Sequence, residues 1–209
     1  NAFIDNTKIH IEGDKIVGSS KTIVSGYKKI NYFNYLEYET TPDKIKEFYN
    51  IRLQKGNNKF LIENFEESNK FEYDKDLEIV YDFKIDNYIK NIAKETYINL
   101  NLNRTLSGFK TEDDRENDIE YSYKQKLKYN TTFTIPEGFT VDYLPENTIF
   151  SNDYITCETS YTLNENVIVY NHLIILDFIN LNIEQQKEVN DLIDKVDKTY
   201  KEVIVLKIK

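Results

Sequence analysis

Strict alternation of apolar and polar side chains is the feature that most constrains this chain. Over residues 77–85, apolar Leu77, Ile79 and Tyr81 interleave with polar or outward-facing residues. A period of two over nine residues predicts a strand with one buried face. Similar segments occur at residues 8–12, 16–19, 59–63, 96–102, 119–128, 131–135, 139–144, 154–163, 167–176 and 203–209. The sequence therefore predicts a mainly β protein with antiparallel, sandwich-like sheets.

Turn residues connect these strands. The Glu12-Gly13-Asp14 segment predicts a hairpin turn, and the asparagines of residues 163–166 predict another between strands 154–163 and 167–176. With only 6 Gly and 3 Pro in the chain, Asn and Asp must form most of the other turns.

Two segments carry a helical period and predict two helices packed on the sheets. Thr41 and Pro42 suit the start of a helix over residues 42–53, and Gly56 follows as a stop. Asn182 suits the N-cap of a second helix over residues 183–200, whose apolar residues recur at helical spacing.

Aromatic residues are abundant, with 17 Tyr and 12 Phe but no Trp. Most of them alternate in phase with the predicted strands, which favours a role in core packing. Residues 29–38 are aromatic on both faces of a predicted strand. We therefore expect Tyr32, Phe33 and Tyr35 to form a candidate interaction surface.

The net charge of −9 argues against nonspecific binding to nucleic acids, because a negative average field repels phosphates. The mean hydropathy is −0.62, and no apolar run approaches the ~18 residues of a membrane-spanning helix.

Residues with catalytic chemistry are sparse. Cys157, His172 and Asp177 are the types that form a thiol nucleophile with its base and orienting acid. However, Cys157 and His172 lie in predicted strands, with no helix N-terminus to lower the pKa of the thiol. We expect Cys157 to be a small core residue and the chain to be no enzyme.

Metal and cofactor sites are not expected either. The histidines, His10 and His172, lie on separate strands without a second ligand at metal-binding spacing. The acidic run at residues 112–118 lacks the Gly-containing spacing of a calcium loop, and it reads as a solvated connection. The chain also lacks a Gly-rich phosphate loop.

Residues 110–118 form the predicted seam between two halves, 1–110 and 115–209, which can also form one continuous unit. The chain starts Asn1-Ala2-Phe3 and contains no Met. We therefore expect it to be a piece of a longer polypeptide.

The second half resembles a known module. Residues 135–139 read Ile-Pro-Glu-Gly-Phe and residues 141–146 read Val-Asp-Tyr-Leu-Pro-Glu, which is similar to a segment in the C-terminal module of large exported bacterial proteins. Residues 170–173 and 203–207 continue the resemblance, and residues 97–102 and 114–119 match it more weakly because a proline of the family pattern is replaced. In those proteins, an N-terminal β domain and a transglutaminase-like core of papain fold precede this β-rich module of unknown function.

The resemblance implies a noncatalytic accessory module that packs against or presents such a core, in the periplasm or at the cell surface. Its partners would be other domains of the same polypeptide. None of the matching motifs is catalytic, so the resemblance assigns no catalytic, cofactor or metal residue. The alternative from another class is a β-sandwich that binds a cell-surface glycan or a peptide through exposed tyrosines.

Overall fold

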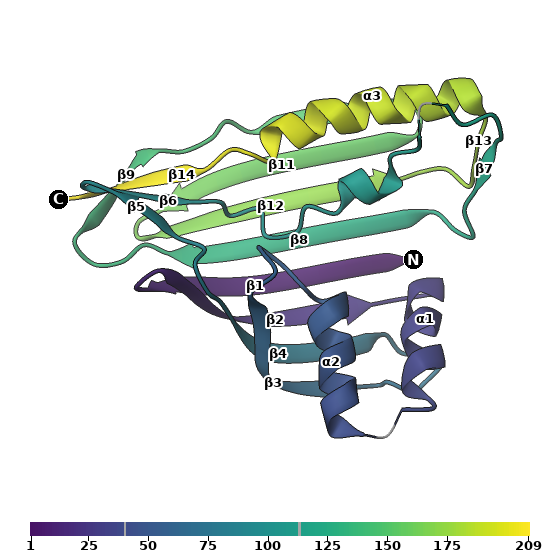
Figure 1. Ribbon diagram of the computed structural model, residues 1–209, viewed down its shortest axis with the longest axis horizontal. Helices are drawn as coiled ribbons and strands as arrows, with labels where there is room; N and C mark the ends of the chain where they lie inside the picture. The colour runs from purple at the N-terminus through teal and green to yellow at the C-terminus, as the bar shows by residue number, and fades with distance from the viewer. Residues whose placement is uncertain (40, 113) are drawn as a thin grey trace.

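The computed structural model describes residues 1–39, 41–112 and 114–209 (Figure 1). Within these ranges the chain forms a mainly β architecture with three α-helices, α1 (Tyr27–Leu36), α2 (Pro42–Arg52) and α3 (Ile183–Thr199). The strands are β1 (Ala2–Glu12), β2 (Lys15–Val24), β3 (Phe60–Ser68), β4 (Leu77–Ile85), β5 (Lys90–Ile92), β6 (Glu95–Ile98), β7 (Ile119–Glu120), β8 (Gln125–Thr134), β9 (Phe139–Tyr143), β10 (Thr148–Ser151), β11 (Ile155–Asn164), β12 (Val167–Leu176), β13 (Asn180–Leu181) and β14 (Ile204–Ile208). A short 3-10 helix, η1 (Leu106–Phe109), precedes β7.

The strands form a large sheet in the order β10-β11-β12-β8-β1-β2-β4-β3 and a small sheet in the order β5-β6-β14-β9. The large sheet is antiparallel except where β1 runs parallel to β8. Because β1 pairs with both β2 and β8, the two predicted halves of the chain contribute to one sheet.

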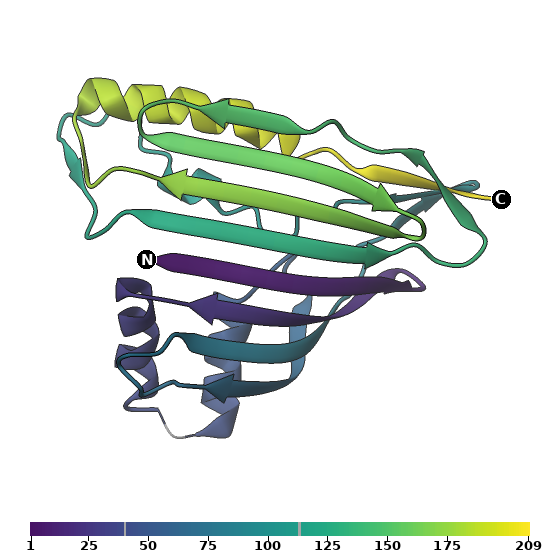
Figure 2. The same ribbon diagram turned by 180° about the vertical axis from the view of Figure 1, so that it is seen from behind.

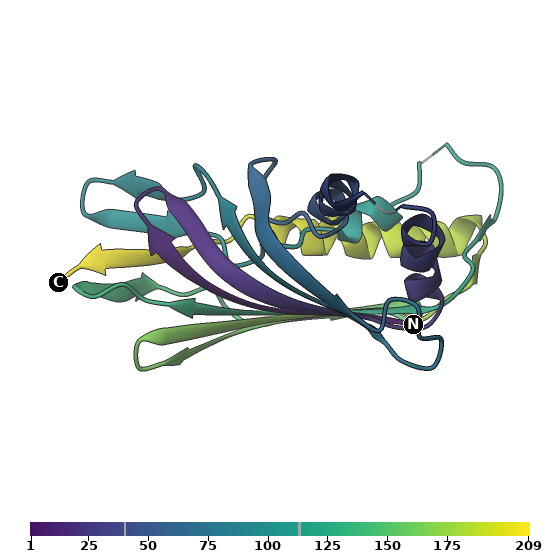
Figure 3. The same cartoon turned by 90° about the horizontal axis from the view of Figure 1, so that it is seen from below.

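The helices and the small sheet lie on one side of the large sheet (Figure 3). The opposite face is viewed in Figure 2, where the strands lie in front of α2. Side chains that point toward the covered side form the core, and β4 shows the predicted alternation because Leu77, Ile79, Tyr81, Phe83 and Ile85 are all buried. The core of the protein therefore lies on the covered side of the large sheet.

Several predicted boundaries are confirmed. α2 begins at Pro42 after Thr41. The Asn182 side chain caps α3 by accepting a hydrogen bond from the main-chain N–H of Gln185, and the Gln185 side chain accepts one from the main-chain N–H of Asn182. The β11–β12 hairpin pairs Asn164 with Val167. The residue with positive φ in this turn is Glu165, at 52°, rather than an asparagine.

The predicted aromatic strand at residues 29–38 is wrong, because this segment forms α1. Its buried residues are Lys29, Tyr32 and Leu36, which are spaced by three and four positions as on one helical face. Gly26 adopts a φ of 62° and ends the extended chain of β2. The Asn1 side chain then accepts from the Tyr27 amide at 2.7 Å and so satisfies a free donor at the start of α1.

Candidate functional site

The surface of α1 next to the β3–β4 connection carries a group of exposed aromatic side chains. Together with the exposed aliphatic Ile30 and the half-buried Phe33, they form what we call the α1 aromatic surface: Tyr27, Ile30, Phe33, Phe71 and Tyr73. Tyr73 is 88% exposed and Tyr27 is 62% exposed, while Phe33 packs edge-on against Phe71 at a ring distance of 5.7 Å. These side chains line a cavity of about 650 Å³, and Asn1 lies at its edge.

Lys29 fixes the loop that carries half of this surface. Its side chain is buried and donates to the main-chain carbonyls of Asn69 at 2.7 Å and Lys75 at 2.6 Å, and also to the carbonyl of Glu72. An ammonium group has three protons, so three carbonyl acceptors satisfy it fully. Lys29 therefore holds residues 69–75 against α1 and positions Phe71 and Tyr73.

The predicted interaction residues take three different positions on α1. Tyr32 is 5% exposed and packs edge-on against Phe48, so it belongs to the core and not to the surface. Tyr35 is 43% exposed and stacks on Phe48 at 4.3 Å. Phe33 alone of the three lines the cavity.

The other members of the α1 aromatic surface were not predicted from the sequence. Tyr27, Ile30 and Phe33 are three positions apart, and this helical spacing was a readable signal. Phe71 and Tyr73 lie in a charged segment between two strands, where aromatic side chains have little core to enter.

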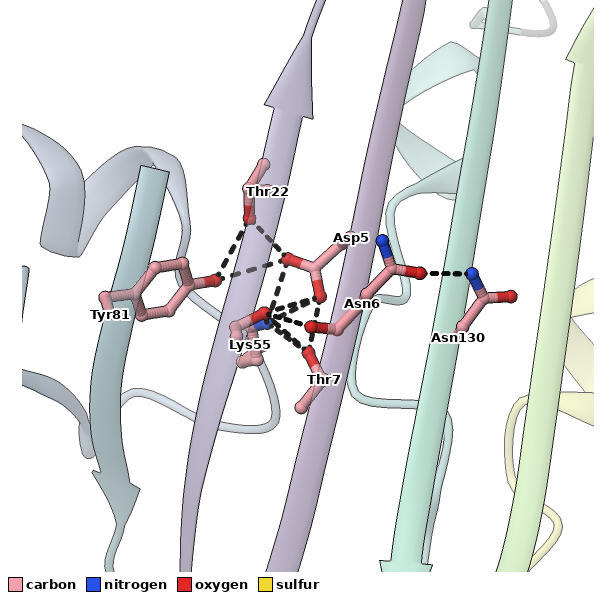
Figure 4. Close-up of polar contacts among 8 residues, drawn as sticks. Asp5, Asn6, Thr7, Thr22, Lys55, Tyr81 and Asn130 are labelled. Carbon is pink, nitrogen blue, oxygen red and sulfur yellow. Dashed lines mark hydrogen bonds and ion pairs between the residues drawn. The ribbon is translucent and has the colours of Figure 1, made fainter. Parts of the chain in front are cut away.

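A separate cluster of buried polar groups lies under α2, between β1, β2 and β4 (Figure 4). The ammonium of Lys55 lies 2.8 and 2.9 Å from the two carboxylate oxygens of Asp5, and it also donates to Thr7 and Ser20. Thr22 and Tyr81 donate to the same carboxylate at 2.9 and 3.2 Å. We call these six residues the Asp5–Lys55 network.

Both charged groups of this network remain ionised. Burial alone would raise the pKa of Asp5, but Lys55 and the hydroxyl donors lower it below its ordinary value. Burial alone would lower the pKa of Lys55, but Asp5 raises it above its ordinary value. The side chains of Lys55 and Asp5 are 0% and 2% exposed, so the network is closed to solvent and ties the loop after α2 to the sheet.

Cys157 and His172 each interact with the side chain of Tyr200, whereas Asp177 lies elsewhere. In the β11–β12 ladder Cys157 lies opposite Ile174, whereas His172 lies opposite Thr159. Cys157 is 1% exposed, and burial raises the pKa of its thiol to about 12. Asp177 lies at the surface, 2.6 Å from Lys124.

His172 forms a buried pair with Tyr200. Its Nδ1 lies 3.2 Å from the Glu158 carbonyl, which only accepts, so Nδ1 carries the proton and Nε2 accepts from the Tyr200 hydroxyl at 2.8 Å. Burial lowers the pKa of His172 to about 4. The imidazole is therefore neutral at pH 7 and has no free nitrogen with which to act as a base.

Within residues 1–39, 41–112 and 114–209, no group of three or more His, Cys, Asp or Glu side chains is placed to hold a metal ion. His10 pairs instead with Glu12 at 3.0 Å. Asp113 of the acidic run lies outside the described residues. None of the described helices is long and apolar enough to cross a membrane.

Comparisons with known proteins find a family model and a limited similarity to a solved structure. A family model described as a domain of unknown function with a solved structure, DUF3858, matches residues 94–206. A crystal structure described as a "putative protease" from Parabacteroides distasonis ATCC 8503 is 18% identical with a TM-score of 0.42, and the match covers 48% of this chain. It covers 20% of that protein, so the chain spans about a fifth of its length. A search of curated proteins finds no match.

Proposed function

Because this chain belongs to DUF3858, a family of domains of unknown function, we propose that it is an accessory module rather than an enzyme. In this proposal the module is part of a larger exported bacterial protein, in the periplasm or at the cell surface. It packs against a transglutaminase-like core in the same polypeptide. The resemblance of residues 135–146 to such proteins supports the choice of core.

The observation that carries the proposal is the α1 aromatic surface. Monomeric proteins rarely leave several large aromatic side chains exposed together, and such groups mark contact sites. Tyr73, Tyr27 and Phe71 are exposed by 88, 62 and 50%. Burial of side chains of this size supplies the largest energies at protein interfaces.

The geometry favours a domain attached on the N-terminal side. Asn1 lies at the edge of the cavity and its side chain contacts the first residue of α1. A domain joined to that end of the chain would lie next to the α1 aromatic surface. Lys29 keeps Phe71 and Tyr73 in place, which lowers the entropy lost on docking.

The test uses the full open reading frame and a binding measurement. If a transglutaminase-like core precedes this chain, that core is added to the isolated chain and the dissociation constant is measured by calorimetry. We expect Phe71→Ser and Tyr73→Ser together to weaken binding by ~10-fold or more. Ile149→Ser on β10 is the matched control, because Ile149 is 72% exposed but lies outside this surface.

Two outcomes would contradict the docking role: an open reading frame without such a core, or equal binding by the wild-type chain and the double variant.

The noncatalytic role has its own test. Cys157→Ala should leave any activity of the full polypeptide unchanged, because this thiol is buried and protonated.

The second candidate function is binding of a glycan or a peptide by the same surface. Its concavity favours this candidate, since about 650 Å³ is a typical volume for a ligand pocket. Saturable binding of an oligosaccharide or a peptide that Tyr73→Ser abolishes, with no binding of the core, would select it. The two candidates are therefore separated by which ligand binds, the core or the oligosaccharide or peptide, because both use the same surface.

A further inference from the structure

A second cavity, of about 310 Å³, lies on the other side of α1 from the aromatic surface. It is enclosed by α1, the end of α2, the segment 103–109 and the strands β1 and β8. The lining residues used in the argument are Lys28, Asn31, Arg52, Asn103, Phe109 and Tyr123.

Two cationic side chains line this cavity without a carboxylate partner. In the described part of the chain, neither Lys28 nor Arg52 forms an ion pair. The Lys28 ammonium contacts the Gln125 side chain at 3.5 Å and lies over the Phe3 ring. Asp5 also lines the cavity, but Lys55 neutralises it. Two unpaired cations are conspicuous in a chain of net charge −9.

The two cations repel one another across the cavity. Burial, and then the charge of Arg52, lower the pKa of Lys28 to about 8. Arg52 is exposed whereas Lys28 is half-buried, so burial and repulsion disfavour the charged form of Lys28. A negative group between the two cations would offset both their repulsion and the loss of hydration of the Lys28 ammonium.

A polar amide completes the cavity. Asn103 is 8% exposed and lines the cavity. The Asn31 amide donates to the Tyr123 hydroxyl at 3.4 Å, and the rings of Tyr123 and Phe109 supply apolar walls.

We propose that this cavity binds a small organic carboxylate, with Arg52 and Lys28 on the carboxylate oxygens and the aromatic rings on the body of the ligand. Guanidinium groups match a carboxylate with two parallel hydrogen bonds. The volume is near the lower end of small-molecule sites, which fits a ligand of the size of one amino acid or one sugar. This inference does not rest on the proposed docking function, although Tyr123 of this cavity stacks on Tyr27 of the α1 aromatic surface at 5.9 Å.

The experiment titrates the intact chain with two carboxylates by calorimetry at low salt. N-acetylphenylalanine represents a peptide carboxyl terminus, and glucuronate represents an acidic sugar. We expect saturable binding of at least one of them, and Arg52→Gln should weaken it by ~10-fold or more. Lys28→Gln should weaken it as well. Lys126→Gln is the matched control, because Lys126 is an exposed lysine outside this cavity.

Two further probes sharpen the assignment. N-acetylphenylalanine amide has the same body without the charge and should not bind. Inorganic phosphate should bind more weakly than the better carboxylate. The proposal is overturned if neither carboxylate binds saturably, if the amide or phosphate binds equally well, or if Arg52→Gln has no effect while circular dichroism shows a native fold.

Discussion

The Asp5–Lys55 network and the His172–Tyr200 pair are two buried polar clusters on the large sheet, and their polar groups are satisfied in opposite ways. Under β1, β2 and β4, Asp5 and Lys55 are both charged and surrounded by hydroxyl donors. Under β11 and β12, His172 is neutral and exchanges hydrogen bonds with Tyr200 and a main-chain carbonyl. Buried charges need a partner, whereas a neutral group needs only matching donors and acceptors.

This difference predicts different responses to acid and to mutation. Removing one charge of the Asp5–Lys55 pair should destabilise the fold, because the other charge stays buried without compensation. The neutral pair is destabilised when His172 acquires a proton, because a buried imidazolium loses its hydration.

Lys55→Met should have the largest effect on stability. It leaves the Asp5 carboxylate buried at 2% exposure without its countercharge. We expect the free energy of unfolding to fall by ~3–5 kcal/mol, measured by urea denaturation. The double variant Asp5→Asn with Lys55→Met removes both charges and should recover at least half of the loss. If the free energy of unfolding of Lys55→Met lies within ~1 kcal/mol of the wild-type value, the ion pair contributes little to stability.

The sequence contains part of the signal for this network. Asp5, Thr7, Ser20 and Thr22 lie at inward positions of β1 and β2, in phase with apolar residues such as Phe3 and Ile9. A charged residue at a core position predicts a buried partner. The partner itself, Lys55, is 50 residues away in a connection without periodicity, so no local pattern identifies it.

The secondary structure of α1 also depends on residues that are distant in the sequence, so no local pattern identifies it as a helix. Its aromatic residues fit a period of two as well as one of 3.6, and Tyr and Phe favour strands in isolation. The contacts that decide between the two periods are nonlocal, namely the Asn1 cap and the bonds from Lys29 to the residues 69–75. By contrast, β4 and α3 were predictable because their alternation and capping box are local.

Lowering the pH should destabilise the His172–Tyr200 pair before it affects the Asp5–Lys55 network. The pKa of His172 is about 4 in the folded chain, against an ordinary value of 6.5. The unfolded state therefore binds more protons between these values, and stability falls as the pH is lowered from about 6.5 to about 4. The expected loss is ~3 kcal/mol, measured by urea denaturation across this range.

The matched variants assign this loss to one residue. His172→Phe with Tyr200→Phe removes the pair without leaving an unpartnered hydroxyl, and it should reduce the loss over this range to below ~1 kcal/mol. His10→Gln changes an exposed histidine and should keep the full loss. An unchanged pH dependence in the first variant would contradict the assignment. Asp5 differs from His172, because it stabilises the fold in its ionised form and its pKa lies below its ordinary value. Its contribution to the free energy of unfolding should therefore persist at pH 5 and be lost only in stronger acid.

Tyr200→Phe should have an intermediate effect at pH 7. It removes the donor to His172 Nε2 and leaves that buried nitrogen without a partner. We expect a loss of ~2 kcal/mol in the free energy of unfolding, measured by urea denaturation. Tyr161→Phe is the matched control, since Tyr161 packs on Tyr170 through its ring and no hydrogen bond of its hydroxyl is found in the described part of the chain. Equal losses in the two variants would show that the hydroxyl of Tyr200 is not what matters.

Tyr81→Phe should have the smallest effect, although it removes a hydrogen bond to a charge. The Tyr81 hydroxyl donates to Asp5 at 3.2 Å, but the same carboxylate oxygen still accepts from Lys55 and Thr22 at 2.9 Å. No buried group is left without a partner, so urea denaturation should show a loss of ~1 kcal/mol. A loss as large as that of Lys55→Met would mean that the network acts as one cooperative unit, in which the neutral donors are as important as the opposite charge.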